Sequence, residues 1–124
     1  ATRMGRNGGG SIVNISSLAS LKPTPLTTVY SAAKAGLNAL TRASAQEYAP
    51  LGVRVNCIVC GTFDTDATAG FVRNPAFLAE VVKPIALARV GRADEVVGAA
   101  LYFASAASSY TTGAIMNIDG GVMP

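Results

Sequence analysis

The order of the apolar segments in this 124-residue chain predicts an α/β fold built on a parallel sheet. Three short segments rich in β-branched residues alternate with two longer ones rich in alanine. This alternation is typical of strands joined by right-handed helical crossovers. The composition agrees, because half of the residues are hydrophobic and only 14% are charged. Strands covered by helices on both faces are apolar almost throughout.

The first strand and the loop after it are marked by β-branched residues and prolines. The sequence Ser-Ile-Val-Asn-Ile-Ser at residues 11–16 predicts a strand, and the glycines at 8–10 break the chain before it. Residues 17–28 contain Pro23 and Pro25 and therefore predict a loop.

The longest predicted helix covers residues 29–49, which lack proline and are rich in alanine and leucine. Thr27 or Thr28 can cap its start, and Pro50 and Gly52 end it. Small residues at helical spacing share one of its faces: Ala32, Gly36, Ala39 and Ala43. Such a stripe lets another element approach closely, either in ordinary core packing or in a helix–helix contact between subunits.

A second strand is predicted over residues 53–60, whose apolar residues occupy both faces, and Gly61 ends it. Cys57 and Cys60 form a C-x-x-C within this strand. A redox pair needs a helix N-terminus to lower the thiol pKa, and four-ligand zinc is impossible with two cysteines and no histidine. We therefore expect no metal site, and cysteines that are buried as small apolar residues.

The segment 62–84 is predicted to be irregular because it contains breakers such as Pro75 and Pro84. Short helical pieces are expected around Phe71 and at residues 77–82. Loops of this length in compact domains are often functional lids.

The last helix is predicted over residues 93–107, with Asp94 and Glu95 in its first turn, where the helix dipole favours carboxylates. A turn at Gly113 leads to a third strand over residues 114–118. The helix is expected to bury one apolar face, formed by Val96, Val97, Ala100, Leu101 and Ala104.

Charge and composition exclude several function classes. Ten arginines and lysines against seven acidic residues give a net charge of +3. The basic residues form no run with interleaved aromatics, which argues against nucleic-acid binding. No segment reaches the roughly 18 apolar residues of a membrane helix, and no apolar signal core follows the basic N-terminus. We expect a cytoplasmic chain without membrane partners. Because histidine is absent, proton transfer must use tyrosine, lysine, a carboxylate or water.

Two observations suggest that the predicted sheet is part of something larger. Half-hydrophobic composition is high for so short a chain, whose surface is large relative to its volume. Three strands also make a thin parallel sheet. We therefore expect a partner subunit or a further part of the same fold to cover apolar surface.

Three side chains in the first half of the chain could carry chemistry. Tyr30 and Lys34 are four residues apart and share one helix face. A lysine ammonium beside a phenol favours the phenolate, which prepares tyrosine for acid–base work near neutral pH. Ser17 lies thirteen residues before Tyr30, just past a strand end. Ligands bind at such ends in parallel sheets, and a hydroxyl there can hold a substrate oxygen.

Several segments, in this order, resemble the short-chain dehydrogenase/reductase family. They are Ile12–Ser17, Tyr30–Gly36, Val53–Asn56, Arg89–Val96, Ser109–Gly113 and Asp119–Gly121. The resemblance runs from Gly10 onward and implies a partial Rossmann-like, doubly wound parallel sheet. It implies that residues 1–124 form the C-terminal half of a single NAD(P)-binding domain, with residues 1–9 matching the tail of the family's fourth helix.

The resemblance also implies roles for single residues. Tyr30 would be the catalytic acid/base, Lys34 would assist it and bind the nicotinamide ribose, and Ser17 would orient the substrate carbonyl or alcohol. Ser16 is the nearby alternative, but the spacing to Tyr30 favours Ser17.

The cofactor-binding residues implied by the resemblance are Tyr30, Lys34, Gly61, Phe63 and Thr65. The segment 62–84 matches the family's variable substrate loop, whose apolar residues suggest an apolar wall: Phe63, Phe71, Val72, Phe77 and Leu78. Cys60 and Ala93 stand where the family commonly has proline. Loss of the first proline is expected to loosen the nicotinamide contact modestly.

The function implied is an oxidoreductase that transfers a hydride between NAD or NADP and a small alcohol or carbonyl substrate. The motifs do not include the family's glycine-rich phosphate turn, because the glycines at 8–10 precede a strand instead of following one. The 124 residues alone are therefore expected to be inactive, and the alternative is an inert or assembly-only piece. The helix carrying Tyr30 is expected to form dimer or tetramer contacts in a homo-oligomer.

Overall fold

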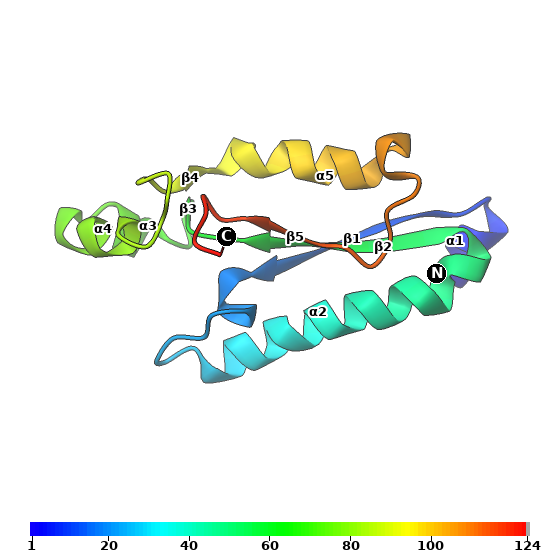
Figure 1. Cartoon of the computed structure of the whole chain (residues 1–124), viewed down its shortest axis with the longest axis horizontal. Helices are drawn as coiled ribbons and strands as arrows, with labels where there is room; N and C mark the ends of the chain where they lie inside the picture. The colour runs from blue at the N-terminus through cyan, green and yellow to red at the C-terminus, as the bar shows by residue number, and fades with distance from the viewer. Residues whose placement is uncertain (124) are drawn as a thin grey trace.

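In the computed structural model, which describes residues 1–123, a three-stranded parallel sheet lies between two helices (Figure 1). The strand order is β1 (Gly10–Ser17), β2 (Val53–Cys60), β5 (Ile115–Ile118). Helix α2 (Thr28–Tyr48) covers one face and helix α5 (Val97–Ala104) the other (Figure 1). The predicted α/β class and parallel sheet are confirmed. A short helix, α1 (Thr2–Arg6), precedes the first strand.

The central strand β2 forms most of the core. Six of its residues are at most 1% exposed, as expected for a parallel strand with a helix on each face: Val53, Val55, Asn56, Cys57, Ile58 and Val59. β1 runs beside it in register from Gly10 opposite Val53 to Ser17 opposite Cys60. The two strands therefore end level with each other, and the residues that follow them lie at one edge of the sheet.

The buried face of α2 is polar. Its buried residues are Ser31, Asn38, Thr41, Ser44 and Ala45. Asn14 Nδ2 of β1 donates to Thr41 Oγ1 at 2.9 Å, and Thr41 donates to the carbonyl of Leu37. Asn38 Nδ2 donates to Ser20 Oγ at 2.8 Å. These hydrogen bonds offset the cost of burying the amides of Asn14 and Asn38 and the hydroxyl of Thr41.

The stripe of small residues on α2 faces outward. Ala32, Gly36, Ala39 and Ala43 are all exposed, and a Cβ added at Gly36 would have nothing within 4 Å. The interpretation that this stripe packs in the core of the chain is therefore wrong. The sequence pattern misleads here because the inward face consists of the polar residues between the small ones.

The last helix is shorter than predicted and turned differently. It begins as a 3-10 turn, η3 (Ala93–Val96), and α5 ends at Ala104, not at residue 107. Ser105 is extended and its hydroxyl accepts from the amide of Ala107, which starts the separate turn η4 (Ala106–Ser108).

The predicted buried face of this helix is largely wrong. Val97 and Leu101 are 48% and 63% exposed, Ala104 is exposed, and Phe103 is fully buried instead. Two strands hold the end of the helix: Ser11 Oγ of β1 donates to the carbonyl of Phe103 at 2.7 Å, and Arg54 Nη2 of β2 donates to the carbonyls of Phe103 and Ser105 at 3.0 and 3.1 Å. These bonds from the sheet fix how the end of the helix is turned.

The segment 62–84 contains the two short helices expected around Phe71 and at residues 77–82. They are α3 (Ala69–Val72) and α4 (Pro75–Val82). The sequence does not predict a second, two-stranded parallel pair, β3 (Phe63–Asp64) with β4 (Gly91–Arg92). Strands of two residues are too short to show a hydrophobic period.

The turn before α2 holds Leu26 at a φ of 68°, in the left-handed region. Pro25 precedes it, and the amide of Thr27 donates to the carbonyl of Thr24 at 3.2 Å, which is a type II turn with leucine where glycine is favoured. The side chain is 103% exposed, so it contributes no packing.

Leu26→Gly is therefore expected to stabilise the protein by about 0.5–1 kcal/mol, because the strain of a left-handed leucine exceeds the entropy cost of glycine. The measurement is the urea midpoint of unfolding. Leu26→Ala, which keeps the strain, is the control and should leave the midpoint unchanged. A glycine variant no more stable than the alanine variant would contradict the argument.

Candidate active site

The carboxyl edge of the sheet gathers the residues singled out by sequence. Ser17 ends β1 beside Cys60, which ends β2. A cavity of about 390 Å³ opens next to the end of β2. Its lining consists of Cys60, Gly61, Phe63, Thr65, Thr68, Ala93 and Val96. Three of the predicted cofactor residues, Gly61, Phe63 and Thr65, thus surround one space, whereas Ser17, Tyr30 and Lys34 are not part of its lining.

Tyr30 and Lys34 lie in the first turns of α2 and contact each other. The Lys34 ammonium is 5.8 Å from the centroid of the Tyr30 ring, and it donates to the carbonyl of Ile15 in β1 at 2.8 Å. The strand therefore fixes the ammonium beside the aromatic ring. Tyr30 is 51% exposed, so its ring remains open to a ligand.

The two serines at the end of β1 have different surroundings. Ser16 is 3% exposed, and its hydroxyl donates to the carbonyl of Lys34 at 3.2 Å. The half-buried Ser17 accepts from the amide of Ala19 at 3.2 Å and caps the turn η1 (Leu18–Ser20). Because Ser17 Oγ acts as an acceptor in that bond, its hydrogen is available to a ligand, while the hydrogen of Ser16 is already used.

Thr68 connects two of the cavity residues and was not predicted. Its Oγ1 accepts from the amide of Thr65 at 3.0 Å and donates to the carbonyl of Phe63. The Thr65 and Thr68 hydroxyls are 3.1 Å apart. A threonine three residues after another in a turn is a recognisable signal, since such hydroxyls bond to nearby backbone groups.

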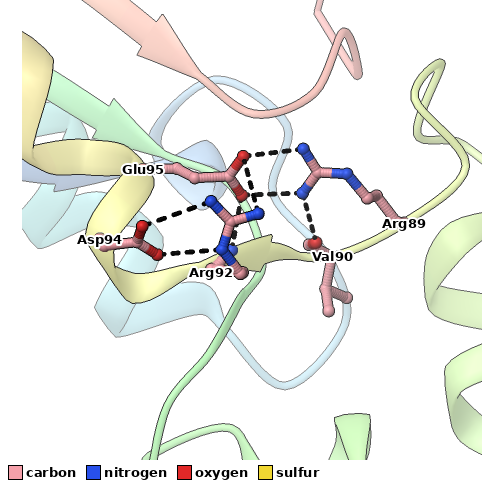
Figure 2. Close-up of polar contacts among 5 residues, drawn as sticks. All are labelled: Arg89, Val90, Arg92, Asp94 and Glu95. Atoms are coloured by element: carbon pink, nitrogen blue, oxygen red, sulfur yellow. Dashed lines mark hydrogen bonds and ion pairs between the residues drawn. The ribbon is translucent and has the colours of Figure 1, made fainter.

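A group of charged side chains lies around the start of η3 (Figure 2). Both oxygens of Glu95 accept from the guanidinium of Arg89, at 2.7 and 2.8 Å, and Oε2 also accepts from the amide of Arg92 at 2.8 Å. Asp94 pairs with the exposed side chain of Arg92. The sequence places both carboxylates correctly in the first turn but does not reveal that Glu95 holds two segments together.

These bonds lower the pKa of Glu95 from 4.5 to about 2, with the Arg89 hydrogen bonds as the largest cause. A carboxyl group with a lowered pKa stabilises the fold fully above its unfolded value. The contribution of Glu95 is therefore present above pH 4.5 and is lost as the pH falls through about 2.

The two cysteines are free thiols with raised pKa values. Burial is the main cause in both, and Cys57 is fully buried while Cys60 is half-buried. Three residues apart on a strand, they lean to different faces. The expected burial of Cys57 is confirmed, and a raised pKa disfavours the reactive thiolate. Among residues 1–123, no group of three histidine, cysteine or acidic side chains could hold a metal ion.

Comparison with known proteins identifies the family. The family model described as enoyl-(acyl carrier protein) reductase matches residues 1–123. The chain belongs to the short-chain dehydrogenase/reductase family. It is 44% identical, over 113 residues, to the 3-oxoacyl-(acyl-carrier-protein) reductase of Chlamydia muridarum, a match covering 91% of this chain and 45% of the relative.

Solved structures of this family have the same fold. The gluconate 5-dehydrogenase of Burkholderia cenocepacia, in complex with NADP and tartrate, is 33% identical with a TM-score of 0.93, covering 98% of this chain and 48% of that one. A short-chain type dehydrogenase/reductase from Mycobacterium ulcerans is also 33% identical, with a TM-score of 0.94 and coverages of 98% and 44%. This short-chain dehydrogenase/reductase chain spans about half the length of the curated relatives it matches. Its described helices include none long and apolar enough to span a membrane.

Proposed function

We propose that the protein is an oxidoreductase that interconverts an alcohol and a carbonyl compound with NAD or NADP. The contact between Lys34 and Tyr30, held by the carbonyl of Ile15, is the observation that carries this proposal. A tyrosine beside a fixed ammonium, half-exposed near the carboxyl edge of a parallel sheet, has the surroundings that an acid–base group needs.

The residues around the 390 Å³ cavity fit the nicotinamide end of the cofactor. They combine the apolar ring of Phe63 with the backbone at Gly61 and the hydroxyl of Thr65, which suits an aromatic ring bearing a carboxamide. The NADP complex of the related gluconate 5-dehydrogenase supports the same class of cofactor here. When bound, this cofactor supplies or accepts the hydride.

The chain's own residues would handle the proton. During reduction, the Tyr30 hydroxyl donates its proton to the carbonyl oxygen, and Lys34 stabilises the phenolate that remains. Ser17 donates a hydrogen bond to the same oxygen and orients it, and the cofactor-binding set is Tyr30, Lys34, Gly61, Phe63 and Thr65. In alcohol oxidation the proton moves in the opposite direction.

We further propose that residues 1–124 form the C-terminal half of one NAD(P)-binding domain and are inactive by themselves. The glycines at positions 8 and 9 precede β1 at positive φ and do not open a helix, so they do not provide the phosphate-binding turn of a dinucleotide fold. The exposed small-residue stripe on α2 supports a dimer or tetramer contact through that helix. An inert, assembly-only role is the alternative.

The test uses the full protein, meaning the longer chain of which residues 1–124 are proposed to be the C-terminal half. Its turnover is measured with NADH and NADPH against a panel of carbonyl compounds. The panel includes a 3-oxoacyl thioester and an oxidised gluconate, because the related proteins are named for such substrates. It also includes a cyclic ketone, because Phe71 and Phe77 form an exposed edge-to-face pair in the predicted substrate loop. Light scattering at micromolar concentration gives the oligomeric state. Oligomers that bind neither cofactor would favour the assembly role, and turnover by residues 1–124 alone would contradict the half-domain proposal.

A further inference from the structure

We propose that Glu95 is a positioning residue for the nicotinamide end of the cofactor site. By binding Arg89 and the amide of Arg92, it ties β4, which pairs with β3, to η3, and thereby fixes two walls of the 390 Å³ cavity. The inference rests on the proposed function, because it concerns the same cavity.

The first step is the bonding of Glu95 itself. Its two oxygens accept three hydrogen bonds, two from the guanidinium of Arg89 and one from the amide of Arg92 (Figure 2). Arg89 Nη1 also donates to the carbonyl of Val90 at 3.1 Å. The Glu95 side chain is 27% exposed, and bidentate pairing between arginine and a carboxylate fixes geometry as well as adding energy. Residues 89–92 are therefore tied to the start of η3.

The second step links β4 to Phe63. The amide of Gly91 donates to the carbonyl of Thr62 at 2.9 Å, and Gly91 pairs with Phe63 in the β3–β4 ladder. A Cβ on Gly91 would lie 2.7 Å from Cδ1 and Cε1 of the Phe63 ring. The ring thus rests directly on the backbone of β4, and a shift of that strand moves the ring.

The third step places the opposite wall. Ala93 and Val96 in η3 line the same cavity as Phe63, and Glu95 lies between them in sequence. A second cavity of about 220 Å³ is lined by Phe63, Gly91, Arg89 and Glu95 among others. Phe63 therefore lines both cavities, whereas Glu95 lines only the smaller one. Glu95 reaches the larger cavity through β4 on one side and through η3 on the other.

Asp94 provides a matched control. It is also an acidic residue of the first turn, but it pairs only with the side chain of Arg92, at 3.1 and 3.3 Å. Both of these side chains are more than 60% exposed. Asp94 has no bond to the backbone of β4, so its removal should leave the cavity unchanged.

The experiment compares Glu95→Gln, Asp94→Asn and Gly91→Ala in the full protein. Dissociation constants for NADH and NADPH are measured by calorimetry, and amide hydrogen exchange is followed in segments 61–68 and 89–96. We expect Glu95→Gln to weaken cofactor binding by roughly tenfold and to speed exchange in both segments. Gly91→Ala, which displaces the ring with Glu95 intact, should weaken binding similarly, and Asp94→Asn should match the wild type.

Two results would overturn the proposal. One is a Glu95→Gln variant with wild-type cofactor affinity and exchange, which would make Glu95 a helix cap only. The other is a Gly91→Ala variant with unchanged affinity, which decides the question even where Glu95→Gln does not fold. A wild-type protein that binds neither cofactor would instead contradict the proposed function, and the exchange data would then test the Glu95 link alone.

Discussion

Tyr30→Phe in the full protein, of which residues 1–124 are proposed to be the C-terminal half, is expected to lower turnover by about 10²–10⁴-fold, the usual contribution of a positioned acid–base group. The substitution removes only the hydroxyl, and the ring beside the Lys34 ammonium stays in place. Because the side chain is 51% exposed, the hydroxyl is not needed for packing, and the unfolding free energy should change little. The measurement is kcat for oxidation of the reduced cofactor, with the urea midpoint recorded on the same samples.

Tyr110→Phe is the matched control for this substitution. Tyr110 is 104% exposed and lies after η4, outside the cavity lining. Its variant should retain wild-type turnover. Unchanged turnover in Tyr30→Phe would rule out Tyr30 as the proton donor, whereas a loss accompanied by unfolding would point to a structural role.

Arg54→Met is expected to destabilise the protein by about 1–3 kcal/mol, because it removes the charged donor that joins β2 to the end of α5. The carbonyls of Phe103 and Ser105 keep weaker, uncharged donors in the hydroxyls of Ser11 and Ser108. Arg54 Nη1 donates to the Ser108 hydroxyl at 2.7 Å and Nη2 to the carbonyls of Phe103 and Ser105. The positive charge also complements the C-terminus of the helix. Methionine keeps the aliphatic length but supplies no donor.

Two further variants separate the causes of this loss. Arg54→Lys keeps the charge without the planar fork and should lose an intermediate amount. Arg42→Met removes an exposed arginine from α2 and should change the unfolding free energy by less than about 0.5 kcal/mol. Urea unfolding of all three variants gives the comparison. Equal stability of Arg54→Met and Arg42→Met would refute the role assigned to the guanidinium.

The fold could be predicted where local pattern and packing agree. The apolar run at 53–60 gives the bounds of β2 as the structure has them, because both faces of that strand are buried. The inward face of α5 could not be predicted in this way. The carbonyl of Phe103 is held by Ser11 and Arg54, which lie 92 and 49 positions away in the sequence, and no helical period contains such bonds.

In the candidate site, too, the residues with a local sequence pattern could be predicted and those that depend on other contacts could not. Tyr30 and Lys34 are recognisable because four residues along a helix is itself a contact distance. Thr68 and Glu95 bond to backbone groups three to five residues away in short turns, where a hydrophobic period gives no information. The pairing of Gly91 with Phe63 spans the whole segment 64–90. Glu95 can be seen in the sequence only as a first-turn carboxylate.

The hydrogen-bonded face between α2 and the sheet has a consequence for precision. An apolar interface would let the helix slide along the sheet more easily, because hydrophobic contacts have no preferred direction. Hydrogen-bonded amides and hydroxyls do not allow such sliding. A shift of the helix by one residue would leave the buried polar groups of Asn14, Ser16 and Asn38 without their hydrogen-bond partners. These hydrogen bonds therefore fix the rotation of α2 about its own axis relative to the sheet. Because Tyr30 and Lys34 lie on α2, their side chains have one fixed orientation relative to β1.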